Sequence, residues 1–134
     1  MSSYVKIVSG LPALLDSLRA FPDIGSGRYP ASQDLVYQGQ LARGLFLVLR
    51  GMIYLRARAH GATVASSLET DRGFGILVPA IEQLNRALPA TIATARQCEI
   101  IFISRMRLRT SPDLADIISQ TSESLREPLE VLEN

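Results

Sequence analysis

Several residue types that build common functional sites are scarce or missing in this sequence of 134 residues. It contains no tryptophan, one histidine (His60) and one cysteine (Cys98). A lone cysteine excludes an intrachain disulfide, and a lone histidine excludes a metal site built from several histidines of one chain. We therefore expect no metal and no other cofactor, and a cytoplasmic location is the simplest one for such a chain.

Long apolar runs and a strong net charge are also lacking. No apolar run approaches the roughly 20 residues that span a bilayer, so no membrane partner is expected. The net charge of +1 gives no global field that would indicate a nucleic-acid partner. Hydrophobic residues make up 47% of the chain and charged residues 20%, which is typical of a packed globular domain.

The sequence does contain a series of short apolar segments separated by glycine-rich turns. Residues 45–49 form an apolar run between Gly44 and Gly51. After Gly51, apolar and polar residues alternate with the period of a strand that has one buried face. A glycine at each corner permits backbone angles that a side chain would forbid. Further extended segments are predicted over residues 28–30, 35–37, 63–68, 74–78, 90–95 and 98–103.

Helical patterns flank these strands on both sides. Leucines at helical spacing between residues 11 and 18 predict a first helix within residues 9–20. The Ser-Pro-Asp sequence at residues 111–113 combines a serine cap, a proline at the first position and an acid in the first turn. Pro128 interrupts the pattern that follows, so residues 111–134 are predicted to form two helical segments.

Many short strands with helices at both ends indicate a mainly β protein. We predict a double-stranded β-helix, or jelly roll, over residues 28–104, with the flanking N-terminal and C-terminal α-helices on either side. A parallel α/β sheet is disfavoured, because this region contains too few helices for crossover connections. Residues 1–134 are expected to form a single domain.

Two motifs resemble the middle of a cyclic-nucleotide-binding domain. The first is Gln38-Gly39-Gln40, and the second is Leu45-Phe46-Leu47-Val48-Leu49-Arg50-Gly51. Their order and spacing are similar to those of the family, in which a helix precedes a jelly roll. Downstream, Gly73-Phe74-Gly75 resembles the start of the family's phosphate-binding cassette, and residues 90–103 resemble the two strands after it. The resemblance implies a sensory or regulatory module, active in signal transduction, and not an enzyme.

The cassette departs from the family's pattern at the positions that hold the ligand. Family members that bind a cyclic nucleotide carry a glutamate after phenylalanine-glycine, and Ile76 stands there in this sequence. They place an arginine against the cyclic phosphate, where Leu88 stands here and Arg86 lies two residues earlier. Because a buried phosphate needs such a partner, we expect that cAMP and cGMP are not bound in the usual way. The resemblance places the ligand site at Phe74, Gly75, Ile76, Arg86, Ala90 and Thr91.

Three functional hypotheses remain open. The first is a stand-alone regulatory module whose ligand, a cyclic nucleotide or another small anion, shifts the C-terminal helices. The second is a protein–protein interaction module without a ligand, which forms a homodimer through the apolar stripe of those helices. The third, a cupin-like enzyme, is disfavoured because cupin metal sites need several histidines. No DNA-binding domain is expected in the chain. The stripe consists of Leu114, Ile117, Ile118, Leu125, Leu129 and Leu132.

Two smaller groups of residues have both a functional and a structural interpretation. Arg105, Arg107 and Arg109 alternate with uncharged residues, which indicates a strand end with one wet face and, as the alternative, a basic strip for a phosphate or a partner. His60 and Cys98 are interpreted as a turn histidine at the surface and a buried strand cysteine, because the sequence gives no spacing for a metal or haem site.

Overall fold

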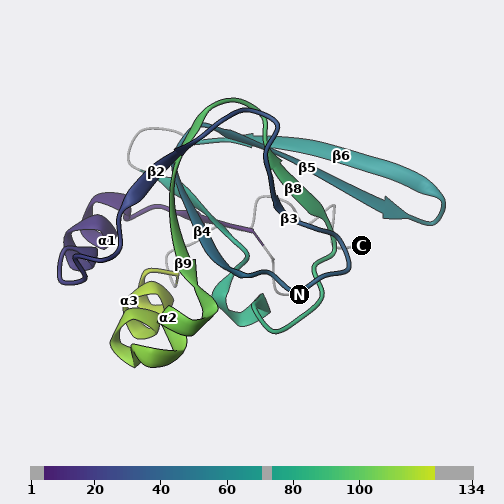
Figure 1. Cartoon of the computed structure of the whole chain (residues 1–134). Helices are drawn as coiled ribbons and strands as arrows, with labels where there is room; N and C mark the ends of the chain where they lie inside the picture. Colours follow the sequence, from purple (N-terminus) through teal and green to yellow (C-terminus); the bar gives the residue numbers. More distant parts are fainter. Residues whose placement is uncertain (1–4, 71–73, 123–134) are drawn as a thin grey trace.

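Two antiparallel sheets form the framework of the structure, a computed structural model that describes residues 5–70 and 74–122 (Figure 1). The first sheet has five strands in the order β1-β7-β4-β9-β2, and the second has four in the order β3-β8-β5-β6. The elements in chain order are β1 (Lys6–Val8), α1 (Leu11–Leu18), β2 (Ser26–Tyr29), β3 (Asp34–Val36), β4 (Gly44–Arg50), β5 (Met52–Ala59), β6 (Ala62–Glu69), β7 (Gly75–Val78), the 3-10 helix η1 (Ile81–Gln83), β8 (Thr91–Thr94), β9 (Cys98–Ser104), α2 (Arg105–Thr110) and α3 (Pro112–Ser122).

The strands pair in a nested series, which confirms the predicted jelly roll with helical flanks. β5 pairs with β6, β4 with β7, β3 with β8 and β2 with β9, each antiparallel. A long hairpin that folds back on itself in this way gives the double-stranded β-helix. β1 is not predicted from the sequence, because a strand of three residues is too short to show a period.

Two apolar cores on opposite faces of the first sheet explain the unbroken apolar run of β4. Leu45 and Leu47 belong to the core between this sheet and the helices, whereas Phe46 and Val48 belong to the core between the two sheets. Because successive side chains of a strand point to opposite faces, a strand that is covered on both sides is apolar throughout. β5 instead alternates buried and exposed residues, since only its inner face is covered.

The helices cover the outer face of the first sheet. Leu11, Leu14 and Leu18 of α1 are buried there together with Leu114 and Ile118 of α3. Two residues of the stripe predicted for dimerisation therefore pack within their own chain. No described helix is long and apolar enough to cross a membrane. The rest of the predicted C-terminal helical region lies outside the described residues, including Leu125, Pro128, Leu129 and Leu132.

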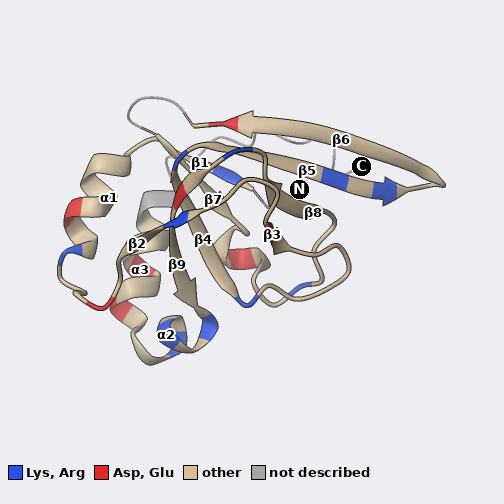
Figure 2. Cartoon of the chain, turned by 45° about the horizontal axis from the view of Figure 1, so that its top comes forward, with Lys and Arg blue, Asp and Glu red and all other residues tan. Residues whose placement is uncertain are grey.

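Residues 105–110 form a helix, so the strand end predicted there is wrong. Ser104 caps this helix, and its Oγ accepts a hydrogen bond from the backbone N–H of Arg107 at 3.1 Å. A serine cap satisfies a free donor of the first turn and favours a helix at this point. Arg105 and Arg107 of α2 donate to different partners, Arg105 to the carbonyl of Leu84 and Arg107 to Asp23. Figure 2 shows their positive charge on this short helix.

Arg107 anchors α2 to the loop that follows α1. Its Nε and Nη2 donate to the two carboxylate oxygens of Asp23 at 2.6 and 3.0 Å. The guanidinium also lies over the ring of Phe21, 5.4 Å from the centroid. The bidentate hydrogen bonding by Arg107 keeps the pKa of Asp23 below its usual value, because it favours the charged carboxylate.

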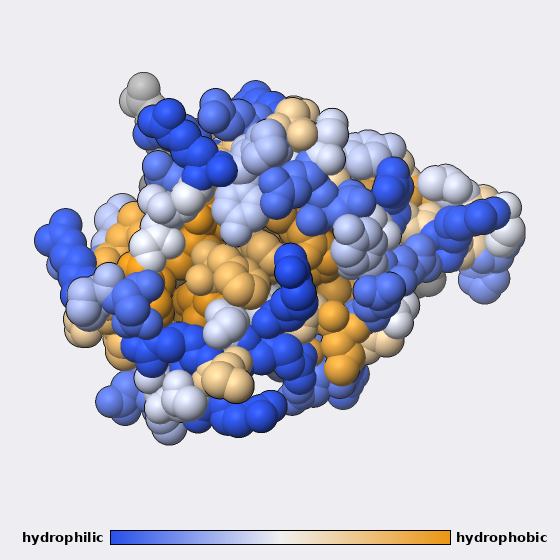
Figure 3. Space-filling model, in the orientation of Figure 1, coloured by the Kyte–Doolittle hydropathy of each residue, from blue (hydrophilic) through white to orange (hydrophobic). Residues whose placement is uncertain are grey.

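Apolar surface remains visible between the polar residues of one face. In the space-filling view it lies near the centre of the molecule, framed by hydrophilic residues, while the β5–β6 hairpin projects to the right (Figure 3). The hairpin therefore extends beyond the part of the jelly roll that encloses the core (Figure 1).

The glycines at the two ends of β4 stand where a side chain has no room. A Cβ at Gly44 would lie 2.8 Å from the Cα of Ser104, and one at Gly51 would lie 3.0 Å from the Cα of Cys98. Gly51 also has a φ of 135°, which L-residues rarely adopt. Both corners therefore require glycine, Gly44 for space and Gly51 for space and backbone conformation.

Gly51→Ala is expected to lower the free energy of unfolding by about 2 kcal/mol or more, because it adds backbone strain to a collision with Cys98. Urea denaturation followed by circular dichroism measures the change. Gly25→Ala is the matched control, since a Cβ there would meet no atom within 4 Å. The control is expected to stay within about 0.5 kcal/mol of the wild type. Equal losses in the two variants would contradict the steric explanation.

Candidate functional site

The positions at which the resemblance places a ligand lie largely inside the apolar core. Ile76 and Ala90 are 0% exposed and Leu88 is 3% exposed, and all belong to the core between the sheets. Phe74 is half-buried, and Gly75 is buried so closely that a Cβ would lie 2.7 Å from a backbone oxygen of β4. These side chains offer no acceptor to a ribose hydroxyl and no charge to a phosphate.

Arg86 lies at the surface, whereas Leu88 is buried. Its backbone N–H donates to the carbonyl of Gln83 at 3.1 Å, which continues the turn of η1. Within residues 5–70 and 74–122, no hydrogen bond or ion pair holds its guanidinium. Of the predicted site residues, Gly75, Ile76 and Ala90 are thus buried, whereas Arg86 is exposed.

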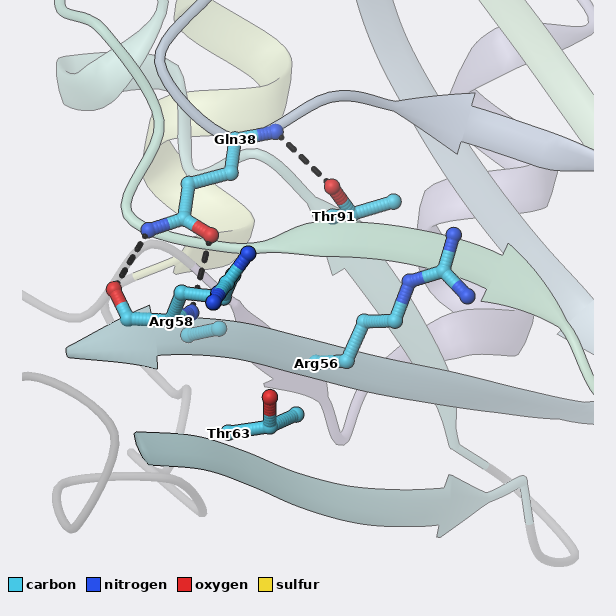
Figure 4. Close-up of a pocket in the computed structure, with 6 residues that line it drawn as sticks. Gln38, Arg56, Arg58, Thr63 and Thr91 are labelled. Atoms are coloured by element: carbon cyan, nitrogen blue, oxygen red, sulfur yellow. Dashed lines mark hydrogen bonds between the residues drawn. The ribbon is translucent and has the colours of Figure 1, made fainter. Parts of the chain in front are cut away.

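Thr91, the remaining predicted residue, lines a pocket at the end of the second sheet. The pocket has a volume of about 210 Å³ and lies between β5, β6, β8 and the segment that follows β3 (Figure 4). We call it the rim pocket. Its lining residues are Gln38, Arg56, Ala57, Arg58, Thr63 and Thr91.

The side chain of Gln38 continues the hydrogen-bond pattern of β5 at the point where β8 begins. The β5–β8 ladder ends at the pair of Arg56 and Thr91. Two residues further along β5, Arg58 would be opposite Pro89, which has no N–H to donate. Gln38 supplies the missing groups, because its Nε2 donates to the carbonyl of Arg58 at 2.9 Å and its Oε1 accepts from the Arg58 N–H at 3.0 Å.

Backbone groups of the same corner hold the segment that enters β8. The N–H of Gln38 donates to Thr91 Oγ1 at 3.0 Å, and the N–H of Gly39 donates to the carbonyl of Leu88 at 2.8 Å. The N–H of Leu88 in turn donates to the carbonyl of Gln40 at 3.0 Å. The Gln-Gly-Gln motif, which carries part of the resemblance, is therefore a structural clamp on residues 88–91.

Two arginines give the rim pocket a positive charge. Arg56 and Arg58 are alternate residues of β5, so both side chains project from its outer face (Figure 4). No acidic side chain in the described part of the chain forms an ion pair with either guanidinium. Arg96 differs, since it is paired with Glu69 at 2.6 Å. The rim pocket therefore holds cationic groups that are free to bind an anion.

Hydroxyl groups stand on both sides of these arginines. Thr91 of β8 lies opposite Arg56 in the ladder, and Thr63 of β6 lies opposite Arg58. Thr91 Oγ1 accepts from the N–H of Gln38, which leaves its O–H as a donor. The sequence indicates Thr91 as a site residue but neither arginine, because the alternation of β5 shows only that the two arginines face water.

Arg105 links the region of the clamp to the C-terminal helices. Its side chain donates to the carbonyls of Ala42 and Leu84 at 3.3 and 2.5 Å and to Asn85 Oδ1 at 2.6 Å. Its backbone N–H donates to the carbonyl of Arg43 at 3.1 Å. The start of α2 is thereby joined to the segment after the clamp and to the loop after η1. No signal in the sequence distinguished this arginine from its neighbours.

His60 and Cys98 lie on different elements, as predicted. His60 is exposed in the turn between β5 and β6, whereas Cys98 at the start of β9 is 2% exposed. Burial raises the pKa of the Cys98 thiol, which keeps it protonated and unreactive. The described residues contain no group of histidine, cysteine and acidic side chains that would hold a metal ion.

Comparison with known proteins identifies relatives in structure alone. No protein-family model matches the sequence, and no curated protein matches it. The catabolite activator protein of Thermus thermophilus superposes with a TM-score of 0.60 at 18% identity, over 82% of this chain and 50% of that one. A cAMP-binding acyltransferase from Mycobacterium smegmatis gives 0.54 at 19% identity, over 81% and 34%. The chain has the fold of a cyclic-nucleotide-binding domain.

A transcriptional regulator from Thermotoga maritima has the same fold and a more similar length. It superposes with a TM-score of 0.54 at 13% identity, over 81% of this chain and 87% of that one. The chain thus spans about half the length of the Thermus protein but most of the Thermotoga protein. The resemblance seen in the glycine-bounded motifs is confirmed at the level of the fold.

Gln38→Ala is expected to destabilise the protein by about 1 kcal/mol, because it leaves both backbone groups of Arg58 without a partner in the protein. Hydrogen exchange of the Arg58 amide, followed by NMR, measures the effect directly, and the exchange is expected to accelerate. Gln40→Ala is the control, since Gln40 contributes only backbone groups to the clamp. An unchanged exchange rate in the Gln38 variant would show that its side chain does not serve as a strand partner.

Proposed function

We propose that this chain is a regulatory module of cyclic-nucleotide-binding fold that binds a small anion in the rim pocket. The observation that carries the proposal is that Arg56 and Arg58 lie beside the hydroxyl of Thr91 and form no ion pair with any described residue. A guanidinium binds carboxylate and phosphate oxygens through two parallel hydrogen bonds. A volume of about 210 Å³ suits a small ligand, since pockets that hold drug-sized ligands measure roughly 300–1,000 Å³.

The packing of the interior supports a ligand at the rim instead of a cyclic nucleotide in the core. A nucleotide in the family's position would have to displace Leu88 and bring a phosphate into an apolar environment. A buried charge without a paired, hydrogen-bonded partner costs several kcal/mol. Ile76 cannot accept from a ribose hydroxyl. The usual mode of cyclic-nucleotide binding is therefore unfavourable in this chain.

The clamp and Arg105 provide a route from the rim pocket to the C-terminal helices. An anion between Arg56 and Arg58 would relieve their mutual repulsion and order the Gln38 corner beside them. That corner continues into Ala42, whose carbonyl accepts from Arg105 at the start of α2. In our proposal the ligand binds more tightly when the Arg105–Ala42 hydrogen bond is formed than when it is broken. Ligand binding therefore favours the position of α2 and α3 that this hydrogen bond holds. The helices would then present the regulatory surface.

Inorganic phosphate tests the pocket directly. Titration calorimetry at constant ionic strength, with sodium chloride as the reference, is expected to give saturable binding to the wild type. Arg56→Ala/Arg58→Ala should weaken binding at least tenfold, because hydrogen bonds to charged groups contribute about 1.5–3 kcal/mol each. Arg86→Ala/Arg109→Ala removes the same charge from exposed positions outside the pocket and should bind like the wild type. Equal weakening of phosphate binding in both variants would show that the net charge of the protein, and not the rim pocket, determines the affinity.

Cyclic nucleotides give an independent test of the interior. Titrations with cAMP and cGMP are expected to show no binding beyond that of inorganic phosphate, and any heat should disappear in the Arg56→Ala/Arg58→Ala variant. Saturable binding that persists in this variant would place the nucleotide in the core and overturn our interpretation of Ile76 and Leu88. The phosphate titration distinguishes this outcome from failure of the rim pocket.

A further inference from the structure

The edges of the two sheets are protected unequally against pairing with another chain. The edge strands are β1 and β2 in the first sheet and β3 and β6 in the second. β1 and β3 have three residues each, and the register of β3 shifts between Asp34 and Val36. β2 has four residues, carries Arg28 and is followed by Pro30. Short length, charge, proline and bulges are the features by which proteins prevent edge pairing.

β6 has none of these protections along most of its length. It has eight residues, and those from Ala62 to Leu68 include no charged residue, proline or glycine. In the charge view β6 is tan apart from a red segment at its end, which corresponds to Glu69 (Figure 2). β6 pairs with β5 over its whole length, and no other strand of the described chain pairs with its second edge.

One face of the projecting hairpin also leaves an apolar side chain exposed. Val64 lies on the same face of β6 as Leu68, whose side chain packs against the core between the sheets. Val64 is 38% exposed, because the hairpin extends beyond that core (Figure 1). The free edge and the uncovered valine therefore occur on the same strand.

We propose that β6 pairs antiparallel with β6 of a second copy of this chain, around a two-fold axis at Ser66. Residues directly opposite each other in an antiparallel pair share a face, so even-numbered residues must face even-numbered ones. With Ser66 on the axis, Val64 faces Leu68 of the partner subunit, and Ala65 faces Ser67 of the partner subunit. The two four-stranded sheets become one continuous sheet.

This register is self-complementary in shape and charge. The two-fold axis repeats the contact of Val64 with Leu68 at both ends of the interface, so both exposed valines are covered. The charged residue of β6, Glu69, faces Thr63 of the partner subunit, and no like charges face each other. A second copy therefore fits this edge better than a charged peptide, which would find no complementary charge on β6.

Sedimentation velocity of the full chain over a wide range of concentration tests the proposal. The wild type is expected to reach twice the monomer mass of 14.7 kDa. In Ala65→Lys/Ser67→Lys the introduced lysines lie directly opposite each other across the interface, and the dimer should dissociate at least tenfold more readily. In Ala65→Lys/Ser67→Glu the opposite residues carry opposite charges, and dimerisation should recover.

The matched control is Ala13→Lys/Ser17→Lys, which makes the same changes at exposed positions of α1 and should dimerise like the wild type. Recovery in the lysine–glutamate variant also shows that the edge tolerates substitution without unfolding. A wild type that remains monomeric at all concentrations overturns the proposal. So does a dimer that is equally stable in the lysine–lysine and lysine–glutamate variants, because the interface then lies elsewhere.

Discussion

Burial of β4 on both faces is the constraint on which the rest of the structure depends. Leu45 and Leu47 must be covered on one side and Phe46 and Val48 on the other, which places the helices outside the first sheet and the second sheet opposite it. The space between the sheets is thereby committed to apolar packing. Ile76 of β7, the neighbour of β4, belongs to that packing.

The polar chemistry of the molecule is concentrated where regular strand pairing ends. Pro89 terminates the β5–β8 ladder because it has no N–H, and the amide of Gln38 supplies both hydrogen bonds instead. These two hydrogen bonds fix the backbone at Arg58 and so position one of the two guanidinium groups of the rim pocket. A corner that resembles a nucleotide-binding motif in sequence thus acts first as a structural element.

The sequence was sufficient to predict the fold because its strongest signals are local. The run at residues 45–49, the alternation of β5 and the Ser-Pro-Asp start of α3 are each set by neighbouring residues. The position of the rim pocket is not set by neighbouring residues, since it depends on which residue lies opposite Arg58 in the folded jelly roll. The alternation of arginines at residues 105–109 led to the wrong prediction of a strand, whereas the cap at Ser104 favours the helix α2.

The two strands of the projecting hairpin limit association in different ways. Arg56 and Arg58 charge the outer face of β5, which disfavours stacking of that face on another sheet, whereas the edge of β6 is uncharged. The opposite edge of the same sheet, β3, is short and bulged. Pairing through β6 alone therefore closes after two copies and does not propagate into a fibre, because a two-fold contact consumes the one long open edge that each described chain offers.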